Sequence, residues 1–133
     1  MAVAQAQDDR VVESLQTLGL EFLSEWDALV FLHRHTVSLC TAAQIAQLMG
    51  HDKPEIVAAL RKLEALGLIR RSRISQGIRF YRFSAPAEPP RLACMVELMT
   101  LGEDRAGRLL LLKHLKRPTV VIRRKRRDGL RLA

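Results

Sequence analysis

The chain has 133 residues, of which 48% are hydrophobic, and it carries a formal net charge of +8. This length suits a single domain that buries about two-thirds of its unfolded surface in one core. No apolar run approaches the roughly 18 residues that span a bilayer, and the N-terminus lacks the charged-then-apolar pattern of a signal peptide. We therefore expect a cytoplasmic protein without a membrane partner.

The positive charge is concentrated at one end of the chain. Residues 1–112 contain 13 Lys and Arg against 13 Asp and Glu, whereas residues 113–133 contain nine basic residues and one acid. Within the balanced part, the first 27 residues hold six acids, and five arginines between Gly67 and Pro86 have no acid among them. This segregation favours a polyanionic partner and predicts salt-sensitive binding.

The N-terminal segment predicts a disordered start followed by two helices. Residues 1–7 are small and polar and are expected to be disordered. Over residues 8–18 the apolar side chains fall on one helical face, which is suited to a short dimer arm, and Gly19 ends that helix. A stronger helix is expected over residues 25–35, with an apolar stripe that packs under the following motif.

A capping box opens the next predicted helix. In Thr41-Ala42-Ala43-Gln44, the Thr41 hydroxyl can accept a hydrogen bond from the third amide of the helix, while Gln44 reaches back to the Thr41 amide. Apolar residues then recur at helical spacing until Gly50, which can adopt the left-handed conformation that ends a helix. We predict a short helix that begins at Thr41 and a turn at Gly50.

A second capping box, Asp52-Lys53-Pro54-Glu55, follows this turn. Pro54 lies in the first helical turn, where its missing amide proton costs nothing because that amide has no partner within the helix. An aliphatic stripe at helical spacing continues to Gly67, which closes the helix. Two short helices joined by about three residues predict a helix-turn-helix.

After the second helix the pattern becomes β-prone. The runs 68–74 and 78–83 are separated by Ser75-Gln76-Gly77. We predict a β-hairpin with a glycine in its turn. Its strands are too aromatic for the alternation of side chains to decide which face is buried, so the register stays open.

The segment TAAQIAQLMGHDKPEIVAALRKLEALGLIRRSRISQGIRFYRFS resembles the DNA-binding half of MarR-like and ArsR-like bacterial regulators. Besides the basic hairpin, the residues that carry the resemblance are Leu63, Glu64, Gly67, Leu68, Ile69 and Arg71. The resemblance implies a winged helix-turn-helix, a mainly α fold with a small β-hairpin wing, here with flanking N- and C-terminal helices. It also implies DNA binding, although winged helices serve as protein-docking modules too.

Two more helices are expected after the prolines that follow the hairpin. One begins near Arg91, and a capping pattern at Thr100 to Glu103 predicts a break near Gly102 before a second helix over residues 103–116. These helices have more apolar surface than a single domain of this size has to bury, so we expect a two-fold homodimer in which a second copy covers that surface. The alternative is that the helices fold back over the core of their own chain. The expected dimer contacts are Leu92, Met95, Met99, Ala106, Leu109 and Leu112.

Beyond Pro118 a short β-branched run precedes a basic cluster. We expect a flexible arm that binds phosphates, and a solvated terminus is the alternative. The basic residues of this arm are Arg123, Arg124, Lys125, Arg126 and Arg127. The chain is thus divided into an N-terminal arm (1–23), a winged helix-turn-helix (24–85), a helical dimerisation extension (86–117) and a basic tail (118–133).

In a DNA-bound winged helix the second motif helix enters the major groove, and the wing lies against the backbone or minor groove. The helix residues expected at DNA are Lys53, Val57, Ala58, Arg61 and Lys62. The wing residues expected there are Arg70, Arg71, Arg73, Gln76 and Arg79. Members of the family usually have polar side chains that contact base edges at the positions of Val57 and Ala58. Few bidentate hydrogen bonds to bases, worth about 1–3 kcal/mol each, are therefore available to this chain. We expect modest or shape-based specificity.

Catalytic, metal and cofactor functions have little support. The sequence has no Gly-rich phosphate loop, no HExxH motif and no nucleophile elbow, so we predict that the protein is not an enzyme. His33, His35 and Cys40 lie close in sequence but no fourth ligand is evident, and we assign no metal and no cofactor. Cys40 and Cys94 belong to no CxxC pair and are expected to be reduced, buried thiols.

These expectations together describe a dimeric transcriptional regulator that binds double-stranded DNA, with half-sites about one helical turn apart. The alternative is a protein-interaction module. In that case the small apolar side chains of Val57 and Ala58 would form a docking surface for a partner from the transcription machinery, such as a polymerase or a chromosome factor. Only the basic tail would then contact nucleic acid.

Overall fold

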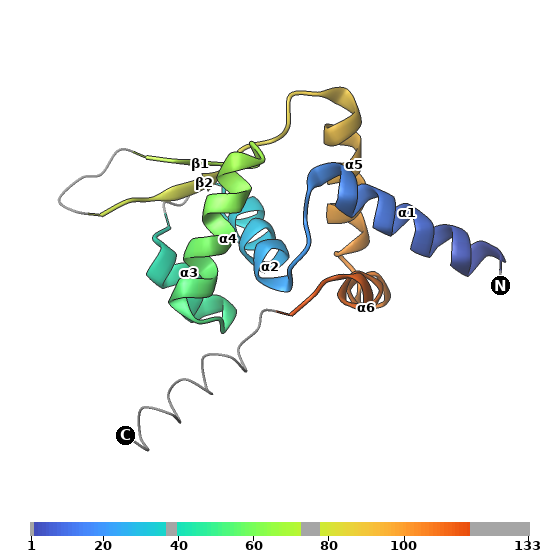
Figure 1. Ribbon diagram of the computed structural model, residues 1–133, viewed down its shortest axis with the longest axis horizontal. Coiled ribbons are helices and arrows are strands. Elements are labelled where there is room, and N and C mark those ends of the chain that lie inside the picture. The colour runs from blue at the N-terminus through green and yellow to red at the C-terminus, as the bar shows by residue number, and fades with distance from the viewer. Residues whose placement is uncertain (1, 37–39, 73–77, 118–133) are drawn as a thin grey trace, which may run out of the picture.

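The computed structural model describes residues 2–36, 40–72 and 78–117, which contain six helices and a two-stranded sheet (Figure 1). The elements are α1 (Ala2–Leu18), α2 (Leu23–Arg34), α3 (Ala42–Met49), α4 (Lys53–Ala65), β1 (Ile69–Arg71), β2 (Tyr81–Phe83), α5 (Pro89–Leu101) and α6 (Arg105–His114). In Figure 1, α3, α4 and the hairpin lie on one side of α2, and α1, α5 and α6 lie on the other. The predicted winged helix-turn-helix with flanking helices is confirmed.

The first capping box forms as predicted. Thr41 Oγ1 accepts a hydrogen bond from the Gln44 amide at 3.2 Å, and Gln44 Oε1 accepts one from the Thr41 amide at 2.9 Å. The helix that they open, α3, ends at Gly50, whose φ of 75° lies in the left-handed region that favours glycine. Only the residues from Gly50 to Asp52 separate α3 from α4.

The second capping box does not form, which corrects the prediction at this position. Asp52 is the N-cap residue of α4, but its side chain makes no capping hydrogen bond. Glu55 pairs with His51, with 3.5 Å between Glu55 Oε2 and His51 Nδ1. The helix still begins here because Pro54 occupies a first-turn position that needs no amide proton.

The hairpin is antiparallel, and its register pairs Ile69 with Phe83, Arg70 with Arg82 and Arg71 with Tyr81. The Tyr81 amide also donates to the Cys40 carbonyl at 2.9 Å, so the segment before α3 is joined to the second strand. Both strands are shorter than the runs 68–74 and 78–83 that we predicted. The predicted turn at residues 75–77 lies outside the described residues.

The N-terminus is helical from Ala2, which corrects the expectation that residues 1–7 are disordered. Within this first part of α1, Gln5 Nε2 donates to Asp9 Oδ1 at 3.0 Å, one turn further on. The helix ends as predicted before Gly19, whose amide donates to the Leu15 carbonyl at 2.9 Å.

The start of α2 is set by a buried carboxylate. Glu25 Oε1 accepts hydrogen bonds from the amides of Glu21 at 2.8 Å and Phe22 at 3.1 Å. Glu25 is the third residue of the helix and reaches back to the amides that precede it, as the acid of a capping box does. The helix therefore begins at Leu23, two residues before the predicted start.

The predicted break near Gly102 is confirmed, because α5 ends at Leu101 with Gly102 as its C-cap residue, but α6 begins at Arg105 rather than at residue 103. Asp104 is the N-cap residue of α6, and its Oδ1 accepts a hydrogen bond from the Gly107 amide at 2.7 Å. A Cβ added to Gly107 would lie 1.7 Å from the Leu101 carbonyl oxygen. Only glycine allows the backbones of the two helices to approach so closely.

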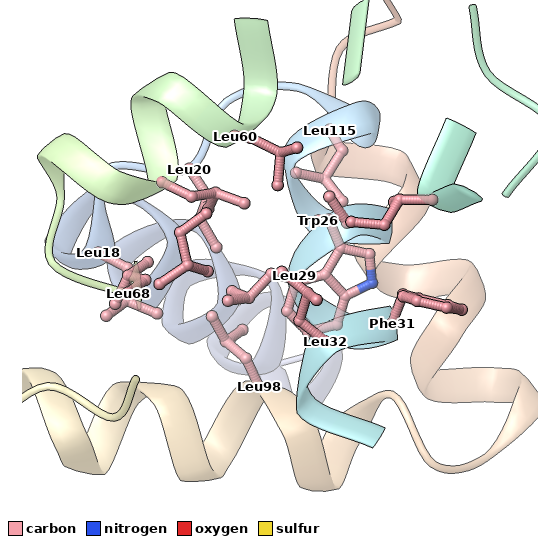
Figure 2. Close-up of a cluster of buried hydrophobic side chains, with 14 of the residues drawn as sticks. Leu18, Leu20, Trp26, Leu29, Phe31, Leu32, Leu60, Leu68, Leu98 and Leu115 are labelled. Carbon is pink, nitrogen blue, oxygen red and sulfur yellow. The ribbon is translucent and has the colours of Figure 1, made fainter. Parts of the chain in front are cut away.

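One cluster of buried side chains joins the winged helix to its flanking helices (Figure 2). Leu18 of α1, Leu60 of α4 and Leu98 of α5 all belong to it and are fully buried. The flanking helices thus share the core of the winged helix, as the fold-back alternative predicted. No helix in the described part of the chain is both long and apolar enough to cross a membrane.

Candidate nucleic-acid interface

The outer face of α4 is open to solvent. Lys53, Ala58 and Arg61 are exposed and Val57 is half-buried, whereas the opposite face packs into the core. Figure 1 shows α4 and the hairpin on the side of α2 that lies away from α1 and α6. The described flanking helices therefore leave this face uncovered, as binding to a duplex requires.

The start of α4 is fastened to α2 through His51, a residue that the sequence did not single out. His51 Nε2 lies 2.7 Å from Asp27 Oδ2 on α2, and its Nδ1 faces Glu55 on α4. The imidazole side chain is only 11% exposed. These contacts fix the turn of α4 that carries Lys53 relative to α2. Asp27 is 24 residues away in sequence, so no local pattern could indicate this contact.

Lys62, which was predicted at the reading face, makes its contacts within the chain. Its ammonium pairs with Glu21 and, at 3.2 Å, with Glu25 Oε2, and it lies 5.7 Å from the centroid of the Phe22 ring. Glu25 is 3% exposed, so this contact is at the edge of the core. The charge of Lys62 is used within the chain, where it holds α4 against the segment between α1 and α2.

The electrostatics of this contact favour the charged forms of its members. Burial alone would lower the pKa of Lys62, but the hydrogen bond to Glu21 and the charge of Glu25 outweigh it, so the pKa is raised above its ordinary 10.5. The same hydrogen bond lowers the pKa of Glu21 below its ordinary 4.5. The ion pair is therefore fully charged at neutral pH.

The wing presents a pair of arginines that the register brings together. Arg70 and Arg82 are directly opposite on neighbouring strands, and both are exposed. Like charges in such a cross-strand pair repel one another. Within the described part of the chain neither arginine has an ion-pair partner, so an anion bound between them would relieve the repulsion. Arg82 was absent from the predicted wing set because only the register reveals its partner.

The remaining wing predictions have different outcomes. Arg71 Nε pairs with Glu64 Oε2 of α4 at 2.8 Å, so an acid outside the hairpin already neutralises it. Arg79 is half-buried, and its Nε has no hydrogen-bond partner among the described residues. Arg73 and Gln76 lie outside the described residues.

The C-terminal end of α4 is held by a cation from α5. The Arg91 guanidinium donates to the Leu66 carbonyl at 2.6 Å and to Glu88 Oε1 at 3.1 Å. A positive charge here complements the negative end of the helix dipole. Three contacts therefore hold α4, one at its start through His51 and two at its C-terminal end through Lys62 and Arg91.

The residues predicted at a dimer contact divide into two groups. Met95 is 2% exposed within its own chain and Met99 is half-buried, so the prediction for Met95 is corrected: it packs into the core. The exposed members are Leu92 on α5 and Ala106, Leu109 and Leu112 on α6. Val96, which is 57% exposed, adds to the apolar surface of α5. The predicted tail contacts, residues 123–127, lie outside the described residues.

The cysteines and the neighbouring histidines have packing roles. Cys40 is a buried free thiol whose pKa is raised by that burial, and Cys94 is free but only half-buried. The His33 ring meets Phe83 edge-on, with 4.9 Å between the ring centroids. In the parts of the chain described by the structure, no three metal-ligating side chains cluster.

The two short helices, their tight turn and the basic hairpin define the class of winged helix-turn-helix transcriptional regulators. Within this class, the model of the MarR family matches residues 10–77, half of the chain. The protein therefore belongs to the MarR family. No curated protein sequence matches the chain.

Solved structures of MepR from Staphylococcus aureus share the fold. A MepR–DNA complex has a TM-score of 0.58 and 16% identity, covering 74% of this chain and 77% of MepR. A MepR mutant bound to an oligodeoxyribonucleotide has a TM-score of 0.56 and 14% identity, covering 98% and 90%. MepR described as a transcription regulator of the multidrug efflux pump MepA has a TM-score of 0.53 and 16% identity, covering 98% and 90%.

Proposed function

We propose that this protein regulates transcription by binding double-stranded DNA, with α4 in the major groove and the wing against the phosphate backbone. The main support is the exposed face of α4, which is held by three contacts and stands beside Arg70 and Arg82, two arginines that have no ion-pair partner among the described residues. Membership of the MarR family and the DNA complexes of the MepR fold agree with this proposal. A regulator of a bacterial chromosome would act in the cytoplasm.

We infer that sequence selectivity is modest. On α4 the available donors are Lys53 and Arg61, because Lys62 is paired inside the chain. Val57 and Ala58 can contact a thymine methyl group but cannot donate a hydrogen bond to a base edge. Shape and phosphate contacts would therefore supply much of the discrimination.

The proposed active form is a homodimer. Leu92 and Val96 on α5, and Leu109 and Leu112 on α6, are between 39% and 57% exposed on helices whose other faces are in the core. A second copy would cover this apolar surface in a two-fold arrangement, which is the commonest among oligomers. It would also place two α4 helices about one helical turn of DNA apart.

A pair of matched variants tests the DNA-binding proposal. Fluorescence anisotropy with duplexes that the wild type selects from genomic DNA should show about tenfold or greater loss of affinity for Lys53→Ala/Arg61→Ala. Arg105→Ala removes an exposed arginine from α6, far from the proposed face, and should leave affinity within about twofold.

Equal effects of these two variants would show that only general charge matters and would contradict the proposed use of α4. Unchanged affinity in Lys53→Ala/Arg61→Ala would favour the alternative, in which the winged helix docks another protein. That alternative has its support in the short, apolar side chains of Val57 and Ala58.

A further inference from the structure

His51 lies where α2, α3 and α4 meet. Its backbone amide donates to the Ala46 carbonyl of α3 at 3.0 Å. Its side chain lies between Asp27 of α2 and Glu55 of α4. The imidazole is 11% exposed and the Glu55 side chain 8%, so this contact is largely shielded from water. A single residue thus links the start of α4 to both neighbouring helices.

Both ring nitrogens of His51 face carboxylate oxygens. Nε2 lies 2.7 Å from Asp27 Oδ2, and Nδ1 lies 3.5 Å from Glu55 Oε2. An ionised carboxylate can only accept hydrogen bonds, and a neutral imidazole carries a proton on only one of its two nitrogens. A neutral ring would therefore direct a nitrogen lone pair toward one of the two carboxylates. The imidazolium, with a proton on each nitrogen, suits both.

The charges around the ring favour the same form. Among the described residues, the charged side chains that pair with the imidazole are Asp27 from α2 and Glu55 from α4, and α3 has no charged residue. Asp52 and Lys53, which follow His51 in the chain, are both exposed. Two nearby negative charges stabilise the imidazolium, and loss of its proton would leave the two carboxylates to repel one another without a cation between them.

This contact is part of the turn that presents the proposed reading face. Lys53 lies two residues beyond His51, and Val57 lies two residues beyond Glu55, both within the first turns of α4. We propose that His51 is a positioning residue for DNA binding: its imidazolium holds the start of α4 in the orientation that reads DNA, and affinity falls as rising pH removes the proton. The inference rests on the proposed binding by α4.

The direction of the pH effect follows from linkage. Histidine changes its charge near neutral pH, in a range where carboxylates stay ionised. Binding that requires the imidazolium is strongest below the pH at which the free protein loses the proton, and it weakens above that pH. Each chain keeps one proton on binding, so the fall in affinity is limited to about tenfold per pH unit for each bound chain.

The first experiment compares pH profiles of DNA binding. In anisotropy titrations of the full chain on a selected duplex, wild-type affinity should fall by about tenfold or more between about pH 5.5 and pH 8.5. His51→Gln cannot carry the charge, so its affinity should be low and constant over this range. Asp27→Asn keeps the shape of the partner but removes one negative charge, so the fall should begin at a lower pH.

The matched control for these profiles is His114→Gln. His114 also pairs with a carboxylate, with 2.9 Å between its Nε2 and Asp8 Oδ1, but it lies on α6. This variant should keep the wild-type profile. A fall in His51→Gln as steep as that of the wild type, or loss of the fall in His114→Gln, would overturn the inference.

The second experiment observes the protons on the ring. Nitrogen-15 NMR of the full chain with labelled histidine, in which the His51 signals are identified by their absence from His51→Gln, shows whether each ring nitrogen is protonated. Both nitrogens should carry a proton at the acidic end of the range, and one proton should be lost over the interval in which affinity falls. Titration in a different interval, or a ring with a single proton throughout, would overturn the inference.

A salt series separates positioning from direct contact with DNA. Because His51 is proposed to act through α4, His51→Gln should keep the wild-type slope of log affinity against log salt at about pH 5.5. A slope shallower by about 0.9 would mean that His51 itself neutralises a phosphate, and the positioning role would be overturned.

The outcomes also distinguish this inference from the proposed function. A wild type that binds selected duplexes equally well at every pH overturns the role of His51 and leaves the proposed function intact. A wild type that binds no duplex at any pH, or that binds equally well as Lys53→Ala/Arg61→Ala, overturns the proposed function. The role of His51 would fail with it, because α4 would have no DNA to read.

Discussion

Lys62 and Arg61 are neighbours on α4 with opposite surroundings. The ammonium of Lys62 contacts Glu21, Glu25 and Phe22, whereas Arg61 is exposed. The first therefore serves the stability of the fold, and the second is available to a ligand. Sequence periodicity placed both on the outer surface because the acids that bind Lys62 come from another part of the chain.

This difference predicts opposite effects of two substitutions. Lys62→Met keeps the aliphatic stem but leaves the buried Glu25 carboxylate without its cation, so the free energy of unfolding should fall by about 1–3 kcal/mol. Its DNA salt slope should stay unchanged. Arg61→Ala should weaken DNA binding with little effect on stability. Urea unfolding and anisotropy measure the two properties, and a shallower salt slope for Lys62→Met would refute its assignment to the fold.

The same ion pair predicts a pH dependence. The pKa of Glu21 is lowered by its hydrogen bond to Lys62, so the stability from this pair is present above the unfolded pKa of about 4.5 and is lost as the pH falls through the folded pKa. Unfolding free energies measured from about pH 6 down to pH 3 should therefore decline less steeply in Lys62→Met than in the wild type. Parallel curves would show that Glu21 titrates independently of Lys62. Asp8, whose pKa is lowered mainly by its hydrogen bond to His114, contributes equally to both proteins.

Among the elements, the helix boundaries show what a local pattern can predict. The box at Thr41 was predictable because both of its hydrogen bonds join residues within one turn. At Asp52 the side chain makes no capping hydrogen bond, and the neighbouring His51 and Glu55 take part in a contact with Asp27 of another helix that no local pattern contains. Register in the hairpin was equally hidden, so the facing arginines could be identified only from the structure.

Two glycines at element ends should respond very differently to alanine. A Cβ on Gly107 would overlap the Leu101 carbonyl, and this backbone atom cannot move without shifting the α5–α6 corner. Gly107→Ala should therefore cost about 3 kcal/mol or more. Gly50 has no atom within 4 Å of such a Cβ, and only its positive φ opposes the change, at about 1–2 kcal/mol. Thermal unfolding of both variants measures this ranking, and a larger loss for Gly50→Ala would contradict the described corner.

For the whole molecule, the flanking helices both complete the core and expose an apolar surface. The sequence predicted that α5 and α6 were too apolar for a surface layer, but it could not tell which apolar residues face inward. Met95 does so, because α5 packs along α1 in the core. Leu109 and Leu112 face outward, and in the proposed dimer a second copy of the chain covers them.

The proposed dimer predicts the effect of charge on this surface. Sedimentation should show wild-type particles of twice the 15.1 kDa chain mass, and Leu109→Glu/Leu112→Glu should give single chains, because a dimer would bury the new carboxylates. Leu48→Glu is the control: Leu48 is 65% exposed on α3, a helix that lies on the other side of α2, so the dimer should persist. A wild type that sediments as single chains at micromolar concentration would end the dimer proposal.

The central claim is that the exposed face of α4 and the wing meets a DNA duplex, and genome-wide footprinting of the bound protein tests it most directly. The wild type should protect discrete sites, each with two major-groove segments about one helical turn apart. Those sites should disappear in Lys53→Ala/Arg61→Ala and persist in Arg105→Ala. Identical footprints for all three proteins, or protection without preferred positions, would contradict the claim.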